Sequence, residues 1–254
     1  MDGRPGPEKP DYRSRVPEFE RKWQEHERRW PRDERAASDL QRPGDPRGSW
    51  RGVGDRYLSP DQNRQADRLI TELRQPEPSI TAQLKRIEAE NPHGAKLAGL
   101  DHRLKGDQRL KEKIADKMRA KGESDPANVI TTINDAVRYT FCFDGNVYVR
   151  AYGDICRRLR AAGYQMMDRE SHWLSDPYYK GLNTRWETRR GDRFELQFHT
   201  PESFHAKEVT HPAYERLRAA GTSRHERREL TRFHRIVNAA IPRPMDIAQL
   251  GGLD

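Results

Sequence analysis

Aliphatic side chains are scarce at the start of this chain, and this limits how much of it can form a hydrophobic core. Apart from alanines and Met1, the first 56 residues contain three aliphatic residues, Val16, Leu40 and Val53, together with seven of the 17 prolines. Ordering the backbone costs about 1 to 2 kcal/mol per residue, which so little apolar surface cannot offset. We therefore expect residues 1–56 to form a disordered tail or linker.

Several classes of protein are excluded by composition. No apolar run approaches the roughly 20 residues that span a bilayer, and residues 1–10 lack the apolar stretch of a signal peptide. Cys142 and Cys156 have no metal-ligand spacing, which argues against a disulfide scaffold and a zinc finger. We expect the protein to act in the reducing cytoplasm, without a membrane partner.

The net charge indicates the kind of partner. The chain carries 48 Lys and Arg against 40 Asp and Glu, a formal charge of +8. Anionic partners such as nucleotides, RNA, DNA or acidic surfaces match this excess. A solvated surface of mixed charge is the plainer alternative.

Periodic apolar patterns predict helices from residue 57 onward. Ser59, Pro60 and Gln62 form a capping signature for the first of two helices within residues 57–96. Further helices are predicted over residues 106–121 and 147–162. Pro201 begins another helix, which Pro212 should break, and Ser223 and Glu226 form a capping box for the last one.

Strand patterns alternate with these helices. β-branched and aromatic residues predict strands over residues 130–143 and 164–167, and a hairpin that pairs residues 182–188 with residues 193–199. We therefore expect an α+β fold, with a mixed, mostly antiparallel sheet of four or five strands flanked by helices. Its parts would be a helical segment over residues 57–96, a core domain over residues 97–240 and a C-terminal tail over residues 241–254.

The second strand of the hairpin presents a row of polar side chains. Because side chains alternate along a strand, Glu195, Gln197 and His199 share one face, while Phe194, Leu196 and Phe198 share the other. A solvent-exposed face explains this alternation equally well. Two further features favour a functional site.

Basic and acidic residues cluster upstream of the hairpin. Arg103, Lys105, Arg109 and Lys113 span a loop and a helix start, where cations and the helix N-terminus would both favour phosphate. Asp135 lies on the predicted strand with Arg138, and an aspartate there needs hydrogen bonds or a metal ion. A second carboxylate, such as Glu195, would complete a Mg²⁺ site. The alternatives are lysines along an ordinary amphipathic helix and a structural pair of Asp135 with Arg138.

With these features in this order, the chain resembles the RelA/SpoT-type nucleotidyl pyrophosphotransferase family, the alarmone synthetase domain. The resemblance covers roughly residues 97–218, about half of the chain. Residues 103–113 are similar to the family's ATP-binding segment, residues 136–138 to its metal-bearing strand, and residues 195–200 to its strand signature of Glu, Gln and Thr. Residues 179–184 take the place of its acceptor-binding loop, and residues 203–214 resemble the helical segment that follows.

The resemblance implies a nucleotidyltransferase-like fold and a Mg²⁺-assisted transfer of the β,γ-pyrophosphate of ATP to a ribose hydroxyl, normally the 3′-OH. Asp135 and Glu195 would hold Mg²⁺ and form the catalytic pair, with Glu195 orienting or deprotonating the attacking hydroxyl. The ATP-binding residues would be Arg103, Lys105, Arg109, Lys113 and Arg138, and either Arg138 or Arg150 would take the place of the family's second adenine-stacking arginine. The acceptor-binding residues would be Tyr178, Tyr179, Lys180, Asn183, Gln197, His199 and His205.

The chain departs from the family's pattern in the spacing of Asp135, which lies three residues before Arg138 where the family's metal-binding Asp commonly lies five before its strand arginine, and at three further positions. The family usually has a serine where Arg109 stands, a tyrosine where Leu182 stands and an arginine where His199 stands. Its tyrosine stacks on the acceptor base, so either Tyr178 or Tyr179 would replace it from a shifted position, or the acceptor is not a free guanine nucleotide.

The histidines allow a different interpretation. His199, His205 and His211 recur every six residues, with Glu208 between the last two. A spacing of six does not match one face of a helix, so this pattern argues against a metal site built from them.

Three functions follow from the sequence. We expect an ATP-dependent pyrophosphotransferase that makes a ppGpp-type or ppApp-type alarmone from a purine nucleotide. One alternative is a toxin that pyrophosphorylates the 3′ end of tRNA, using the arginines within residues 224–235. The other is a nucleotide-binding or RNA-binding module without catalysis. A growth-arresting toxin would act in the cytoplasm of a target cell, carried there by a larger toxin, and its partner would be a cognate antitoxin or immunity protein.

Overall fold

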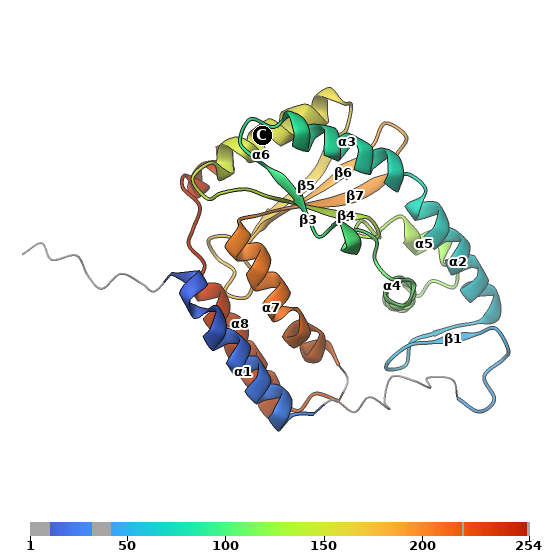
Figure 1. The fold of residues 1–254 in the computed structure, drawn as a ribbon. Helices are drawn as coiled ribbons and strands as arrows, with labels where there is room; N and C mark the ends of the chain where they lie inside the picture. Colours follow the sequence, from blue (N-terminus) through green and yellow to red (C-terminus); the bar gives the residue numbers. More distant parts are fainter. Residues whose placement is uncertain (1–10, 32–41, 220, 253–254) are drawn as a thin grey trace, which may run out of the picture.

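A five-stranded sheet forms the centre of the computed structural model, which describes residues 11–31, 42–219 and 221–252 (Figure 1). The strands lie in the order β3 (Lys96–Ala98), β4 (Arg138–Cys142), β7 (Arg193–His199), β6 (Leu182–Glu187) and β5 (Gln165–Ser171). β4 and β7 run parallel, and the other neighbouring pairs run antiparallel. This confirms the predicted α+β fold with a mixed, mostly antiparallel sheet.

One face of the sheet is apolar and carries the main core. Phe194, Leu196 and Phe198 of β7 are fully buried on it. Helices α3 (Glu77–Glu90) and α6 (Tyr148–Ala161) cover this face, as Figure 1 shows above the strands. The opposite face of β7 therefore holds the polar residues, and α7 (Pro201–Arg218) leaves the end of β7 on that side.

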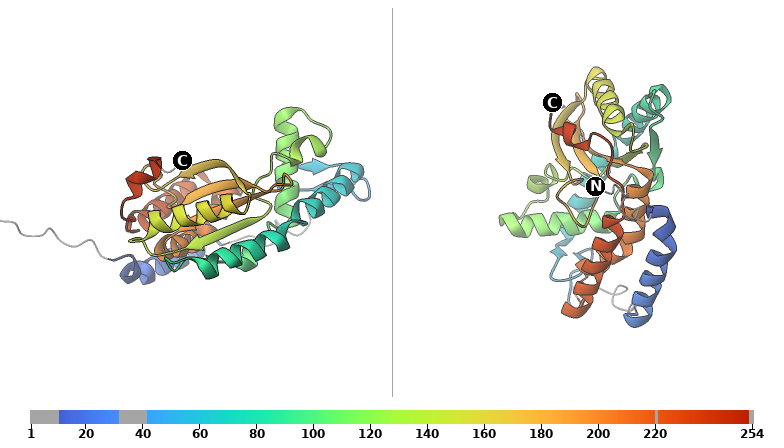
Figure 2. Two further views of the ribbon diagram at one scale, coloured as in Figure 1. Left: turned by 90° about the horizontal axis from the view of Figure 1, so that it is seen from above. Right: turned by 90° about the vertical axis from the view of Figure 1, so that its left-hand side faces the viewer.

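A second, smaller core lies beyond one end of the sheet. It joins α2 (Pro60–Arg74), α4 (Asp107–Lys121), α5 (Ala127–Ile130) and the short hairpin of β1 (Trp50–Arg51) and β2 (Tyr57–Leu58). Figures 1 and 2 both show these elements past the sheet. The predicted capping box is present, because Ser59 and Gln62 bond reciprocally at the start of α2. This arrangement places α4 beside the beginning of β4.

Two predicted elements differ from the structure. The strand predicted over residues 130–143 is β4 alone, because α5 and a turn take up the residues before Arg138. Asp135 therefore lies in the loop that leads into β4. The break expected at Pro212 is absent, and α7 continues through it. Proline removes one backbone donor, and the flanking turns keep this helix intact.

The N-terminal residues do not form the predicted tail where the structure describes them. Residues Tyr12–Arg15 form a 3₁₀ turn and Val16–Arg29 form α1, which runs beside α8 (Arg224–Ala239) in Figures 1 and 2. Phe19 is fully buried, and Trp23 packs against Phe233 with ring centroids 5.9 Å apart. Aromatic residues supply the apolar stripe that a count of aliphatic residues misses. Residues 42–56 of the predicted tail contain β1, whose Trp50 is buried in the second core, and residues 1–10 and 32–41 lie outside the described residues.

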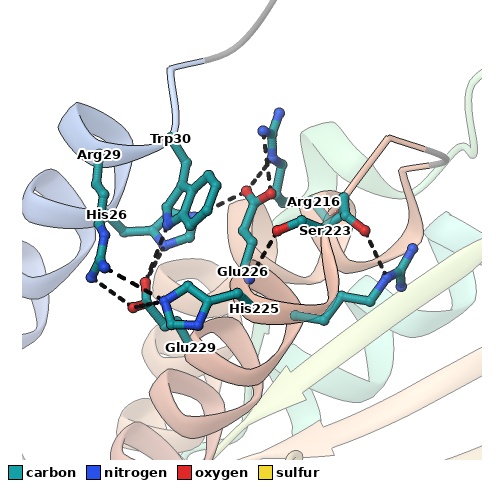
Figure 3. A network of polar contacts seen from close by, with 10 residues as sticks. His26, Arg29, Trp30, Arg216, Ser223, His225, Glu226 and Glu229 are labelled. Atoms are coloured by element: carbon teal, nitrogen blue, oxygen red, sulfur yellow. Dashed lines mark hydrogen bonds and ion pairs between the residues drawn. The ribbon is translucent and has the colours of Figure 1, made fainter.

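A polar network fastens α1 to α8 (Figure 3). Arg29 is ion-paired with Glu229 at 2.7 Å, and the Trp30 indole donates to the same carboxylate at 3.2 Å. Glu226, which is 1% exposed, lies 3.4 Å from His26 and accepts from Arg216 at 2.5 Å. A buried carboxylate is stable only with such partners, so α1 and α7 together satisfy Glu226.

The C-terminal residues also differ from the predicted tail. Residues Ile247–Gly252 form a 3₁₀ turn, and Ile247 and Leu250 are buried in the main core. Within the described residues, no helix is long and apolar enough to cross a membrane.

Removal of the Phe19 side chain tests whether α1 belongs to the fold. Phe19→Ala is expected to lower the free energy of unfolding by about 3 kcal/mol, because a buried ring is replaced by a cavity. Urea unfolding followed by circular dichroism measures this. Glu20→Ala, at an exposed position of the same helix, should change it by less than about 0.5 kcal/mol. Equal stabilities of the two variants would mean that α1 does not pack on the protein in solution.

Candidate active site

The polar face of the sheet is organised in rows across the strands. Parallel pairing of β4 with β7 places Arg138 beside Glu195, Thr140 beside Gln197 and Cys142 beside His199. On the other side of β7, Arg185 and Asn183 of β6 extend the first two of these rows. Glu195 therefore lies between two arginines, near the centre of the sheet.

Asp135 lies next to the start of the Glu195 row. The amide of Glu195 donates to the Val137 carbonyl at 3.0 Å, two residues after Asp135. Leu104 forms an isolated bridge with Val137, and the Lys105 amide donates to the Ala136 carbonyl at 3.0 Å. These backbone contacts bring the loop that carries Lys105 alongside the loop that carries Asp135.

Two lysines hold one oxygen of Asp135. Lys105 Nζ lies 2.8 Å from Asp135 Oδ2, and Lys113 of α4 bonds to the same oxygen. Burial alone would raise the pKa of Asp135, but the two lysines outweigh it and lower the pKa to about 2. The other oxygen, Oδ1, is buried and has no hydrogen-bond partner among the described residues. An unpaired buried carboxylate oxygen is costly, so this atom fits the position of a metal ligand.

Arg103 and Arg109 lie apart from this cluster. Arg103 donates to Glu77 at 2.6 Å and to the Leu100 carbonyl at 3.0 Å. Arg109 is paired with Glu112 of its own helix at 2.7 Å and with Glu215 of α7. Of the four basic residues predicted to bind ATP in this segment, Lys105 and Lys113 thus lie at Asp135. The two arginines are paired with other carboxylates.

A second polar group lies at the C-terminal end of β7, around His199. The Tyr179 hydroxyl donates to Asn183 Oδ1 at 2.9 Å and lies 2.9 Å from His199 Nε2. His199 Nδ1 lies 2.9 Å from the Ser203 hydroxyl in the first turn of α7. His199 is fully buried, and burial lowers its pKa well below the ordinary value. The ring is therefore neutral at pH 7 and serves as a hydrogen-bonding group.

The side chains of three other predicted acceptor residues, Lys180, Tyr178 and His205, have their contacts elsewhere. Lys180 donates to the carbonyls of Trp173 and Asp176, at 3.1 and 2.5 Å, and so shapes the loop before β6. The Tyr178 ring is exposed and faces Arg235 of α8, whose Nη2 donates to the hydroxyl at 2.7 Å. His205 Nδ1 lies 3.0 Å from the Tyr12 hydroxyl, so that this histidine contacts the N-terminal segment.

Lys207 of α7 is a further residue of the site. It extends from α7 to the sheet, where its Nζ donates to Gln197 Oε1 at 2.7 Å. Gln197 Nε2 in turn donates to Glu195 Oε1 at 3.3 Å. The available signal is helical spacing, because Lys207 lies one turn after Ser203, which contacts His199.

Metal ligands in this region are few. The part of the chain that the structure describes contains no group of three or more His, Cys, Asp or Glu residues that could hold a metal ion. Mg²⁺ is commonly bound by one or two carboxylates, with phosphate oxygens and water completing its six ligands. Asp135 and Glu195 are the residues that could supply such carboxylates here.

Comparison with known proteins identifies similar folds at low sequence identity. The small alarmone synthetase 1 from Bacillus subtilis, bound to its product pppGpp, is 17% identical with a TM-score of 0.48, over 74% of this chain and 97% of that chain. The Type VI effector Tas1, in complex with its immunity protein, is 19% identical with a TM-score of 0.45, over 70% and 96%. A GTP pyrophosphokinase family protein from Streptococcus pneumoniae is 14% identical with a TM-score of 0.45, over 72% and 90%.

The first of these proteins is an alarmone synthetase, the class that the sequence resembles. No protein-family model matches the chain, and neither does any curated protein. At these levels of identity and TM-score, the function has to be inferred from the residues of the site itself.

Proposed function

We propose that this protein transfers the β,γ-pyrophosphate of ATP to a ribose hydroxyl, normally the 3′-OH, of a purine nucleotide. The observation that carries this proposal is the polar face around Asp135 and Glu195. Four cations, Lys105, Lys113, Arg138 and Lys207, gather there against these two carboxylates. Such an excess of positive charge in a half-buried site favours a polyanion such as a triphosphate.

The two carboxylates have different surroundings and therefore different proposed roles. Asp135 keeps its charge because of Lys105 and Lys113, and its free oxygen would be a ligand for Mg²⁺. Glu195 would be the second ligand. When bound, Mg²⁺ would neutralise charge on the phosphate oxygens and orient them.

The transfer itself requires little covalent chemistry from the protein. The ribose oxygen forms a bond to the β-phosphorus of ATP, the bond from that phosphorus to the oxygen of the α-phosphate breaks, and AMP leaves. Glu195 orients the hydroxyl and accepts its proton. Lys105 and Lys113 would stabilise charge on the phosphates. Asn183 and Tyr179 would contact the acceptor, with His199 holding the Tyr179 hydroxyl in position. Positioning and electrostatic stabilisation then supply most of the rate.

The direct experiment follows the label from ATP. The protein is incubated with γ-labelled ATP and Mg²⁺, and separately with ADP, GDP, GTP or deacylated tRNA. We expect label on one acceptor, with AMP formed in equal amount. Release of labelled phosphate without labelled acceptor, or no turnover while ATP still binds, would favour a non-catalytic module or a different reaction.

The tRNA alternative is favoured by one surface feature. A groove along α8 is lined by five arginines and Thr231, and the arginines are Arg224, Arg227, Arg228, Arg232 and Arg235. Arg224, Arg228 and Arg232 lie one turn apart and are exposed, and no carboxylate of a described residue lies within ion-pair distance of them. An uncompensated row of arginines suits a phosphodiester chain.

If tRNA is the acceptor, Arg228→Ala should weaken its use about tenfold near 0.15 M salt. The slope of log rate against log salt concentration should also fall by about one unit, because one phosphate contact is lost. Labelling rates measured from low to high salt test this. Transfer to ADP or GDP serves as the internal control and should not change. An unchanged slope for tRNA would exclude this groove as its binding surface.

A toxin role with a dedicated antitoxin or immunity partner is the finer part of this proposal. Its support is the resemblance of the sequence to a family that includes growth-arresting enzymes. Expression in bacteria should arrest growth in proportion to the transfer activity, and growth unaffected by an active protein would exclude the role.

A further inference from the structure

Helices α4 and α7 approach the polar face of the sheet from two sides. Lys113 of α4 bonds to Asp135. Lys207 of α7 donates to Gln197, which in turn donates to Glu195. In Figure 1 the two helices lie below the strands, with α7 to the left and α4 to the right. The carboxylates Asp135 and Glu195 therefore lie between the two helices.

Among the described residues, a single ion pair joins α4 to α7, between Arg109 and Glu215. Arg109 lies one turn before Lys113 and therefore on the same face of α4. Glu215 lies two turns after Lys207, within the same stripe of α7. The pair thus bridges the two helices on the faces that carry the lysines of the site.

A histidine shows how close this bridge is to the sheet. His211 lies on α7, one turn before Glu215 and one turn after Lys207. Burial chiefly, and then the charges of Arg138, Lys207 and Arg109, lower the pKa of His211. Charges separated by more than about 10 Å are largely screened from one another. Arg138 of the sheet and Arg109 of the bridge are therefore near the same imidazole ring, and the bridge spans the approach to the polar face.

The pair of Arg109 with Glu215 is exposed enough for a ligand to replace it. The Arg109 side chain is 43% exposed, and that of Glu215 is 28% exposed. An exposed ion pair favours the paired form by a factor of about five at most. A triphosphate carries several negative charges, and arginine binds phosphate oxygens through strong, charge-assisted hydrogen bonds. A triphosphate between α4 and α7 therefore competes successfully with one carboxylate for Arg109.

We propose that Arg109 and Glu215 form a latch across the site, which is closed without ATP and opens when Arg109 exchanges Glu215 for the triphosphate. The inference rests on the proposed function for its ligand. While the latch is closed, the triphosphate can enter only the open fraction of the protein, which lowers the rate of association by that fraction. Arg109 stands where the family that the sequence resembles usually has a serine, a residue that cannot form such a pair.

The test measures how fast a fluorescent, non-hydrolysable ATP analogue binds in the presence of Mg²⁺, by stopped-flow mixing without an acceptor. Glu215→Gln should raise the association rate about fivefold, because the latched form is lost. Arg109→Gln also opens the latch, but the analogue should dissociate from this variant at least about tenfold faster, since a hydrogen bond between charged groups is lost. Thermal unfolding establishes that each variant is folded. An association rate of Glu215→Gln equal to that of the wild type would overturn the inference, as would unchanged dissociation from Arg109→Gln.

Glu112→Gln is the matched control, because Glu112 pairs with Arg109 at 2.7 Å within α4 and does not take part in the bridge. Its association rate should stay within about twofold of the wild type. The double variant Arg109→Gln/Glu215→Gln separates a latch from simple repulsion of the triphosphate by Glu215. If Glu215 acts through Arg109, its substitution should add nothing in the Arg109→Gln background. Equal acceleration in both backgrounds would reject the latch.

The same measurement separates the latch from the proposed function, because binding of the analogue does not require transfer. A wild type that binds the analogue but labels no acceptor would fail the proposed function, and the association and dissociation rates of the variants would still decide for or against the latch. Absence of binding in the wild type and in Glu215→Gln would reject the latch, since its opening would then give no access to a triphosphate.

Discussion

Glu195→Gln is expected to reduce pyrophosphate transfer by about 1,000-fold or more. The substitution keeps the shape of the side chain on β7 but removes its negative charge and its ability to accept a proton. Loss of a group that acts as both metal ligand and base has effects of this order. The measurement is the initial rate of AMP formation with Mg²⁺-ATP and the best acceptor, and growth arrest in bacteria should be lost together with it.

The matched control for this variant is Glu187→Gln. Glu187 pairs with Arg193 next to the hairpin turn, and the two side chains are ion-paired at 2.8 Å. It should retain the wild-type rate within about twofold, since an exposed pair contributes at most about 1 kcal/mol to stability. Activity of Glu195→Gln close to that of the wild type would contradict the proposed mechanism.

Asp135→Asn is expected to reduce transfer by about 100-fold and also to change how stability depends on pH. In the folded protein the pKa of Asp135 is about 2, against an ordinary value of 3.8. A carboxyl group whose pKa is lowered by folding stabilises the folded protein at pH values above the pKa that the group has in the unfolded chain. For Asp135 this contribution is at most about 2 kcal/mol, and it is lost as the pH falls towards 2. Burial lowers the pKa of Lys105 despite the ion pair, so the net gain is smaller.

The measurement is urea unfolding of the wild type and Asp135→Asn at several pH values. The wild type should be the more stable protein near pH 7, and the difference should shrink between pH 4 and pH 2. Asp168→Asn is the control, because Asp168 forms an exposed pair with Arg185. A difference that is the same at pH 7 and pH 2 would mean that Asp135 is not held charged by the lysines.

The sheet and its polar face were predictable because their signals are local. Alternation along residues 193–199 sets which side chains of β7 face the core, and a short turn sets its pairing with β6. The prediction for Asp135 was less accurate. The apolar residues before it form α5 and a turn rather than a strand, and a short apolar run does not by itself distinguish these. The loop nevertheless leaves Asp135 next to the start of β4.

The parts that the sequence did not predict depend on contacts between distant segments. The stripe of Phe19 and Trp23 becomes apolar surface only when α8 lies opposite it, about 200 residues further along the chain. Lys207 reaches Gln197 because α7 turns back over the sheet. Arg109 is drawn to Glu215 of the same helix α7. No local pattern encodes such partners. Sequence periodicity therefore predicts the helices and strands but not which of them pack together.

The parallel pairing of β4 with β7 also determines when the site around Asp135 and Glu195 can form during synthesis. Asp135 leaves the ribosome well before Glu195, and α6, β5 and β6 are synthesised between them. β7 then has to enter the middle of the sheet, with β4 on one side and β6 on the other. A nascent chain therefore holds only half of the carboxylate pair until this last strand is in place. If the proposed function is right, the protein becomes active in the cell that makes it only when synthesis of the core is nearly complete.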